Sequence, residues 1–212
     1  MDHLTIRPYT VADFPQLLRI QRECFPAPYP EEQLWSLEQI ASHVRHFPEG
    51  ALCAEVGGEL IASSTALIKQ WQPGDPPHTF YEASDHGFIR NHDPSGNSLY
   101  GIDIAVRPEW RGRGVARRLY EARYALVRQL KLERFLTAGR IPGYHLVAGW
   151  MTPEEYVQRV IAGELTDPTV SAQLRNGLEP VGLLRGYLED AESHNCALLM
   201  QWRNPEFDTI GA

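Results

Sequence analysis

Three arginines and two glycines lie close together in the segment VRPEWRGRGVA, residues 106–116. Glycine has no Cβ, so the main-chain N–H groups around Gly112 and Gly114 can approach a ligand closely. A helix that starts directly afterwards would add the unpaired N–H groups of its first turn and the positive end of its dipole. The segment therefore predicts a phosphate-binding site. The alternative is that the glycines only turn the chain and the arginines form a solvated helix face.

The positive charge of the chain is concentrated around this segment. The 212 residues carry a formal net charge of −7, yet residues 107–134 hold nine Lys or Arg against three Glu, a local charge of +6 that leaves −13 elsewhere. A general nucleic-acid or anionic-membrane binder would be basic overall, so we expect neither partner. A Rossmann fingerprint is excluded by the residues between strand and glycine and by Arg117, and a P-loop by the missing Gly-Lys-Ser/Thr.

Asp103 lies in LYGIDIAV, residues 99–106, an apolar run of strand length directly before the anion motif. A carboxylate at this place could accept a proton from a reacting group. The alternative is a structural ion pair with a nearby arginine. Strand alternation puts Asp103 on the face opposite Ile102 and Ile104, and either face could line a cleft.

Other kinds of site have little support. Cys24, Cys53 and Cys196 are widely spaced and odd in number, so we expect neither a zinc cluster nor a disulfide framework, and a reducing cytoplasm fits best. His43 and His46 share a helical face without further ligands, so we expect surface histidines and no metal. A GxSxG hydrolase elbow is absent. The N-terminus lacks signal-peptide features, and no apolar run reaches membrane-spanning length.

The order of elements predicts one α/β domain over residues 1–212. Apolar periodicity, caps and the Gly57-Gly58 turn predict helices around residues 10–24, 34–47, 114–130, 152–165 and 167–177. They predict strands at residues 4–7, 51–56, 60–69, 99–106, 135–139, 178–188 and 196–202. We expect a mixed, mostly antiparallel central sheet flanked by helices, with a terminal antiparallel pair, rather than a doubly wound parallel sheet.

Residues 69–98 and 140–170 read as insertions, and residues 204–212 as a tail. The first insertion is rich in Pro, Gly, Asp and Asn, which indicates a long loop with one helical turn near residues 79–85. Both insertions adjoin the central strands, so both could wall a cleft. The acidic and histidine side chains of the first insertion are candidates for binding a cationic substrate, or else turn formers: Glu82, Asp85, His86, His92 and Asp93.

Arg111-Gly112-Arg113-Gly114-Val115-Ala116 resembles the Arg/Gln-x-x-Gly-x-Gly/Ala signature of the GNAT acyltransferases. The order of elements extends the resemblance from about Leu4 to Trp202, and HDPSGNSLYG and GRIPGY are similar to a GNAT subgroup with long insertions. The resemblance implies acetyl-CoA as cosubstrate and direct transfer of the acyl group to a primary amine. It implies that residues 111–116 hold the CoA pyrophosphate. It also implies that the main chain of Ile104, Ala105 and Val106 holds the pantetheine arm and polarises the thioester carbonyl.

The resemblance further implies that Asp103 is the general base. Many GNAT enzymes carry a tyrosine as general acid four residues before the glycine of a Gly-Phe pair, where this chain has Gln173. Tyr187, Tyr144 or water could replace it, or the thiolate could leave unassisted, since a thiol has a pKa near ~8.5. The alternative function is a noncatalytic acyl-CoA sensor, and a nucleic-acid binder comes third. The acceptor could be a small molecule or a peptide, and the protein a monomer or a homodimer.

Overall fold

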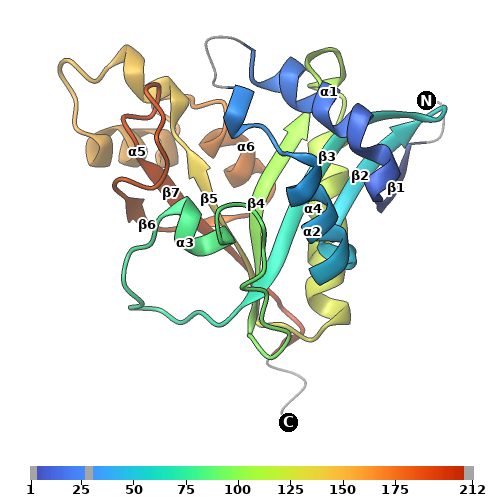
Figure 1. Ribbon diagram of the computed structural model, residues 1–212. Helices are drawn as coiled ribbons and strands as arrows, with labels where there is room; N and C mark the ends of the chain where they lie inside the picture. Colours follow the sequence, from blue (N-terminus) through green and yellow to red (C-terminus); the bar gives the residue numbers. More distant parts are fainter. Residues whose placement is uncertain (1–3, 27–30, 208–212) are drawn as a thin grey trace.

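The computed structural model describes residues 4–26 and 31–207, which form one seven-stranded sheet with helices on both faces (Figure 1). The strand order is β1-β2-β3-β4-β5-β7-β6, and every neighbouring pair is antiparallel except β4 and β5. The mostly antiparallel mixed sheet predicted from the sequence is thereby confirmed. The strands are β1 (Thr5–Pro8), β2 (Ala51–Val56), β3 (Glu59–Lys69), β4 (Ser98–Val106), β5 (Arg134–Arg140), β6 (Glu179–Leu184) and β7 (Ala197–Arg203).

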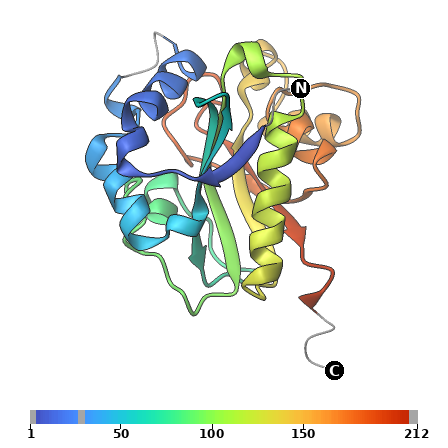
Figure 2. The same ribbon diagram turned by 90° about the vertical axis from the view of Figure 1, so that its right-hand side faces the viewer.

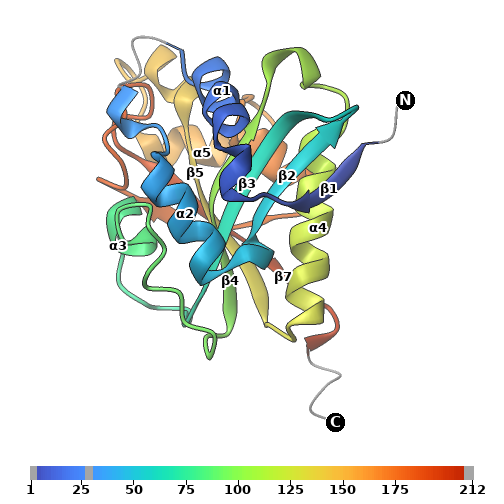
Figure 3. The ribbon, with the colours of Figure 1, turned by 45° about the vertical axis from the view of Figure 1, so that its right-hand side comes forward.

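The helices form two layers. On one face lie α1 (Phe14–Cys24), α2 (Leu37–His46) and the short α3 (Phe80–Ser84), and on the other lies α4 (Val115–Gln129) (Figures 2 and 3). The α4 side also carries α6 (Val170–Arg175), whose Asn176 carbonyl accepts a hydrogen bond from Tyr124 Oη, and α5 (Pro153–Ile161) packs on α6. Within the described residues, no helix combines the length and apolarity needed to cross a membrane.

Local capping sets the starts of the helices. Ser36 Oγ accepts the Gln39 main-chain N–H at 3.2 Å, and Gln39 Oε1 accepts the Ser36 N–H at 2.8 Å, so α2 begins after Ser36 and not at residue 34. The helix predicted from Thr152 does start there, since Thr152 Oγ1 accepts from Glu155 N. It ends at residue 161 rather than 165, just before Gly163 at φ +78°.

β4 and β5 separate halfway along their length. They pair only from Ser98 with Arg134 to Gly101 with Thr137, where Thr137 Oγ1 donates to the Gly101 carbonyl at 2.9 Å. Beyond this point, β4 pairs only with β3 and β5 only with β7. A bulge at Ile102 adds to the separation, because the register of β3 and β4 shifts there. The two strands therefore diverge beyond Gly101 and Thr137 (Figure 1), and we call this split in the strand pairing the slot.

Candidate active site

A cavity of about 260 Å³ lies at the slot between β4 and β5. Of the residues singled out from the sequence, Asp103, Ile104, His86, Tyr187 and Gln173 line it. Aromatic side chains from the first insertion and from the segment before α2 form much of its wall, namely Phe25, Trp35, Phe80 and Tyr81. Trp35 and Phe80 were missed by the sequence analysis, because no local pattern brings residues so far apart to one site.

Asp103 is half-buried and lines this cavity, and its Oδ2 atom is buried. Its Oδ2 has no hydrogen-bond partner among the described residues. Burial raises the pKa of Asp103 to about 6, and the Arg123 charge and the Trp35 side chain lower it in part. The group is therefore mostly ionised at neutral pH and basic enough to take a proton near that pH. Its interaction with Trp35 places it on the face covered by α1 and α2, which decides between the two faces left open by strand alternation.

Beyond Gly101, the edge of β4 that faces the slot has no neighbouring strand among the described residues. Arg107 N donates to Ile61 O at 3.0 Å, and hydrogen-bonded pairs alternate along an antiparallel ladder. Ala105 and Arg107 therefore use their main-chain groups on β3, whereas Ile104 and Val106 point theirs toward the slot. Ala105, which the sequence analysis grouped with these two, has its main chain occupied within the sheet.

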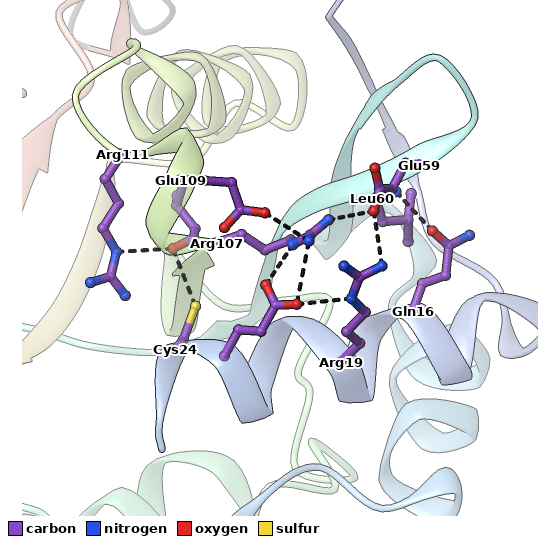
Figure 4. Close-up of polar contacts among 10 residues, drawn as sticks. Gln16, Arg19, Cys24, Glu59, Leu60, Arg107, Glu109 and Arg111 are labelled. Atoms are coloured by element: carbon purple, nitrogen blue, oxygen red, sulfur yellow. Dashed lines mark hydrogen bonds and ion pairs between the residues drawn. The ribbon is translucent and has the colours of Figure 1, made fainter.

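Two side chains, Cys24 and Arg111, donate hydrogen bonds to the carbonyl of Val106 at the end of this edge (Figure 4). Cys24 Sγ donates to it at 3.2 Å and Arg111 Nε at 3.1 Å. Burial raises the pKa of the Cys24 thiol to about 11, which keeps it protonated and a donor. These contacts tie the end of α1 and the first residue of the RGRGVA motif to the last residue of β4.

Arg107 lies at the centre of an ion-pair cluster that joins β4 to α1 and to the β2–β3 hairpin (Figure 4). Its side chain is 5% exposed and pairs with Glu23 at 2.6 Å, Glu59 at 2.6 Å and Glu109 at 2.7 Å. Arg19, which is 56% exposed, pairs with the first two of these carboxylates at 2.8 and 2.9 Å. Arg107 is thus a structural cation, with its charge already compensated by carboxylates.

The glycine-rich loop between β4 and α4 has the form of an anion cradle. Gly112 and Gly114 have φ values of +72° and +79°, and an added Cβ at either position would meet no atom within 4 Å. Gly114 is the N-cap of α4, so the unpaired N–H groups of the first helical turn face the same open space. The loop of residues 111–116 thus leaves open space at both glycines beside a helix start, the kind of position where helix N-termini bind anions in other proteins.

The structure separates the arginines that the sequence groups together. Several have carboxylate partners, namely Arg107, Arg117, Arg128 and Arg134. Arg123 is 1% exposed and donates from Nη2 to the carbonyls of Thr65, at 3.2 Å, and Asp103, so it braces the β4 bulge from the α4 side. Arg111 and Arg113, within the described ranges 4–26 and 31–207, have no carboxylate partner and flank the cradle.

His43 corrects one prediction, since it is fully buried rather than at the surface. Its Nε2 donates to the Gly87 carbonyl at 2.6 Å, so Nδ1 accepts from Tyr9 Oη at 2.8 Å, and Tyr9 accepts in turn from Thr65 Oγ1 at 2.9 Å. Burial lowers the pKa of His43 to about 4, which keeps the ring neutral. Because both ring nitrogens find partners on other segments, the side chain can lie in the core.

Of the five predicted acceptor-binding residues, His86 alone lies at the cavity. The other four stabilise the insertion itself. Glu82 Oε2 accepts the main-chain N–H of Thr79, the N-cap of α3, and Asp85 forms an ion pair with Arg90. Asp93 Oδ1 accepts the N–H of Ser95, and His92 Nδ1 accepts the N–H of Ile68 at 3.0 Å.

The candidate proton donors differ in their access to the cavity. Tyr187 lines it, with its Oη 3.3 Å from Tyr100 Oη, and burial raises the pKa of Tyr187 to about 12. Tyr144 does not line the cavity, and it donates to the Met151 carbonyl at 2.9 Å. Gln173 lines it from α6, with a buried Oε1 that finds no partner in the described part of the chain. It packs on the β5 backbone, since an added Cβ at Gly139 would lie 2.4 Å from that oxygen.

The mixed sheet that splits between β4 and β5, with a glycine-rich loop before α4, is the architecture of an acetyltransferase family, as comparison with known proteins shows. Residues 14–145 match the model of the Acetyltransferase (GNAT) family. The chain belongs to this family. It is 47% identical over 201 residues to the uncharacterized N-acetyltransferase YkwB of Bacillus subtilis, covering 95% of this chain and 89% of that protein. It is 39% identical over 205 residues to the probable hydrolase YhcX of the same organism, covering 96% of this chain but only 39% of that protein.

Solved structures with the same fold include two with long matched segments. The loading GNATL domain of CurA from Lyngbya majuscula superposes with a TM-score of 0.81 at 19% identity, covering 96% of this chain and 98% of that one. The GphF GNAT-like decarboxylase, solved in complex with isobutyryl-CoA, gives a TM-score of 0.78 at 21% identity, with coverages of 94% and 99%. At these identities the match establishes the fold.

Proposed function

We propose that the protein transfers the acetyl group of acetyl-CoA to a primary amine by direct attack. The observation that carries the proposal is the succession, along one segment, of Asp103 and Ile104 in the cavity lining, the end of β4 that is not paired with β5, and the open glycine-rich loop at Gly112 and Gly114. Membership of the acetyltransferase family and the CoA thioester bound by a structural neighbour support it.

Each part of the path has a role in this proposal. The amides of residues 111–116 bind the pyrophosphate, with Arg111 and Arg113 beside it. The main-chain groups of Ile104 and the N–H of Val106 bind the pantetheine arm, and an N–H of this edge polarises the thioester carbonyl. Asp103 takes a proton from the acceptor ammonium, which frees the amine for attack. Acetyl-CoA supplies an acetyl group activated as a thioester.

Tyr187 is the proposed donor to the leaving thiolate, since it lines the cavity and stays protonated at neutral pH. Attack by the neutral amine forms the amide bond and breaks the carbon–sulfur bond of the thioester. CoA leaves as a thiolate, which takes the Tyr187 proton. The resulting tyrosinate takes up the second proton that the nitrogen loses as the amide forms, and Asp103 releases the first proton to solvent.

An acceptor-panel assay with acetyl-CoA tests the function. The release of CoA thiol and the mass of the acetylated product are followed for primary amines of different size and charge. Amine-dependent release with matching product supports the proposal. Tight binding of acetyl-CoA without turnover in any amine would favour the noncatalytic sensor instead.

A further inference from the structure

One wall of the cavity is aromatic and aliphatic. Trp35 and Phe80 stack with their ring centroids 6.1 Å apart, and Tyr81 continues the wall from the same helix as Phe80. Aliphatic side chains complete it, namely Leu34, Ile102 and Leu188. Such a wall favours an apolar ligand surface over a hydrated one.

The wall is built firmly, because α2 binds the main chain of the first insertion. Three consecutive carbonyls accept hydrogen bonds from three α2 side chains. Gln39 Nε2 donates to His86 O at 2.9 Å, His43 Nε2 to Gly87 O at 2.6 Å, and Ser42 Oγ to Phe88 O at 2.5 Å. The segment carries positive φ values at Asp85, His86 and Ile89, a strained conformation that these contacts hold in place.

Few charges in and around the cavity are left to recognise a second cation. Glu82 and Asp93 are used in caps and turns, and Asp85 pairs with Arg90. Arg140, which lines the cavity, pairs with Asp190 at 2.6 Å and Glu192 at 2.9 Å. Glu32 also lines the cavity but is exposed to solvent. Asp103 Oδ2 is therefore the carboxylate oxygen of the described cavity lining that is both buried and without a hydrogen-bond partner.

We infer that the acceptor is a primary amine carried on a flat apolar group, such as an aryl ring joined to the amine by a short alkyl chain. This inference rests on the proposed function and names its substrate class. The ammonium lies at Asp103, where a cation stabilises a carboxylate whose Oδ2 has no hydrogen-bond partner among the described residues. The ring lies against Trp35 and Phe80. A linear diamine would instead place a second ammonium on the apolar wall, and a peptide would place polar main-chain groups there, each at a desolvation cost.

The test compares 2-phenylethylamine, 1,5-diaminopentane and a short peptide with a free N-terminus as acceptors for the full chain. We expect kcat/KM for 2-phenylethylamine to exceed the other two by at least about 10-fold. Equal or higher kcat/KM for the diamine or the peptide overturns the inference and leaves the proposed function intact. If acetyl-CoA binds but no amine is acetylated, the proposed function fails and the inference fails with it.

Phe80→Leu tests the wall itself, with Phe88→Leu as the matched control. Both phenylalanines are half-buried in the same insertion, but only Phe80 lines the cavity. We expect Phe80→Leu to raise the KM for 2-phenylethylamine by about 5-fold or more, with the KM for acetyl-CoA unchanged, and Phe88→Leu to change neither. An equal effect of both variants, or a KM unchanged in Phe80→Leu, contradicts the wall. The selectivity of the wild-type chain remains decisive if either variant fails to fold.

Discussion

The main chain at Gly87 packs directly on the indole of Trp35. An added Cβ at Gly87 would lie 2.4 Å from Trp35 Cζ3 and 2.9 Å from Gln39 Nε2. Trp35 in turn interacts with Asp103. The first insertion therefore reaches the candidate base through one aromatic side chain, which makes Gly87 a positioning residue for the acceptor side of the site.

Gly87→Ala should disturb this contact, and Gly74→Ala provides the control. Both glycines lie in the first insertion at positive φ, +80° and +95°, but nothing lies within 4 Å of an added Cβ at Gly74. We expect both variants to lose stability through backbone strain, and Gly87→Ala to lose about 1–3 kcal/mol more through overpacking. Chemical denaturation measures this difference. Only Gly87→Ala should raise the acceptor KM, so equal behaviour of both variants would argue against the positioning role.

Gly114→Ala should weaken the binding of acetyl-CoA. The methyl group would project into the open space where the proposed pyrophosphate lies, and we expect affinity to fall at least about 10-fold, or about 1.4 kcal/mol. Gly163→Ala is the control, since Gly163 has a φ of +78° against +79° at Gly114, and its Cβ position is also open. Calorimetric titration should show normal affinity in Gly163→Ala. Unchanged affinity in Gly114→Ala would rule out the cradle.

Asp103→Asn should lower kcat by roughly 10²- to 10⁴-fold with little change in acetyl-CoA affinity, the range for loss of a general base. In the wild type, kcat/KM should fall as the pH drops below about 6, because protonated Asp103 cannot accept a proton. A profile of kcat/KM against pH measures this fall on the acidic side. A variant with full turnover from pH 6 to 9 would show that the proton leaves by another route.

The same substitution should stabilise the folded chain at neutral pH. Burial raises the pKa of Asp103, so its contribution to stability is full below its unfolded pKa and is lost as the pH rises through about 6. Asparagine stays neutral and avoids the cost of a buried charge. We expect Asp103→Asn to gain about 1–3 kcal/mol at pH 7.5, shrinking toward pH 4. Denaturation at both pH values checks it, and a loss of stability at pH 7.5 would contradict the assigned burial cost.

Arg107→Gln should destabilise the fold far more than Arg19→Gln, although both arginines bind Glu23 and Glu59. Arg107 is 5% exposed and Arg19 is 56% exposed. Removal of the buried cation leaves three carboxylates with only the exposed Arg19 to compensate them, at a cost of about 2–4 kcal/mol, whereas removal of Arg19 costs less than about 1 kcal/mol. Chemical denaturation of both variants measures the two losses in unfolding free energy, from the shift of the midpoint at an unchanged m-value. Similar losses would show that burial does not set the strength of this cluster.

Local patterns in the sequence determined the elements and the anion loop. The glycines at 112 and 114 need positive φ, and the amphipathic α4 follows them directly, so the cradle can be predicted from about ten residues. The caps at Thr10, Ser36 and Thr152 are likewise contacts within three residues. The order of these elements was then sufficient to predict a mixed, mostly antiparallel sheet.

Only the tertiary structure decided which side chains meet at the slot. Trp35, Phe80 and Asp103 come from segments more than 20 residues apart, and nothing in the spacing of each segment encodes their contact. Likewise, Arg123 looks like one more arginine of a basic helix, yet it is buried beneath the β4 bulge. The physical reason is that burial and pairing depend on which surfaces pack together, and a charge or ring takes its role from partners that the folded sheet brings to it.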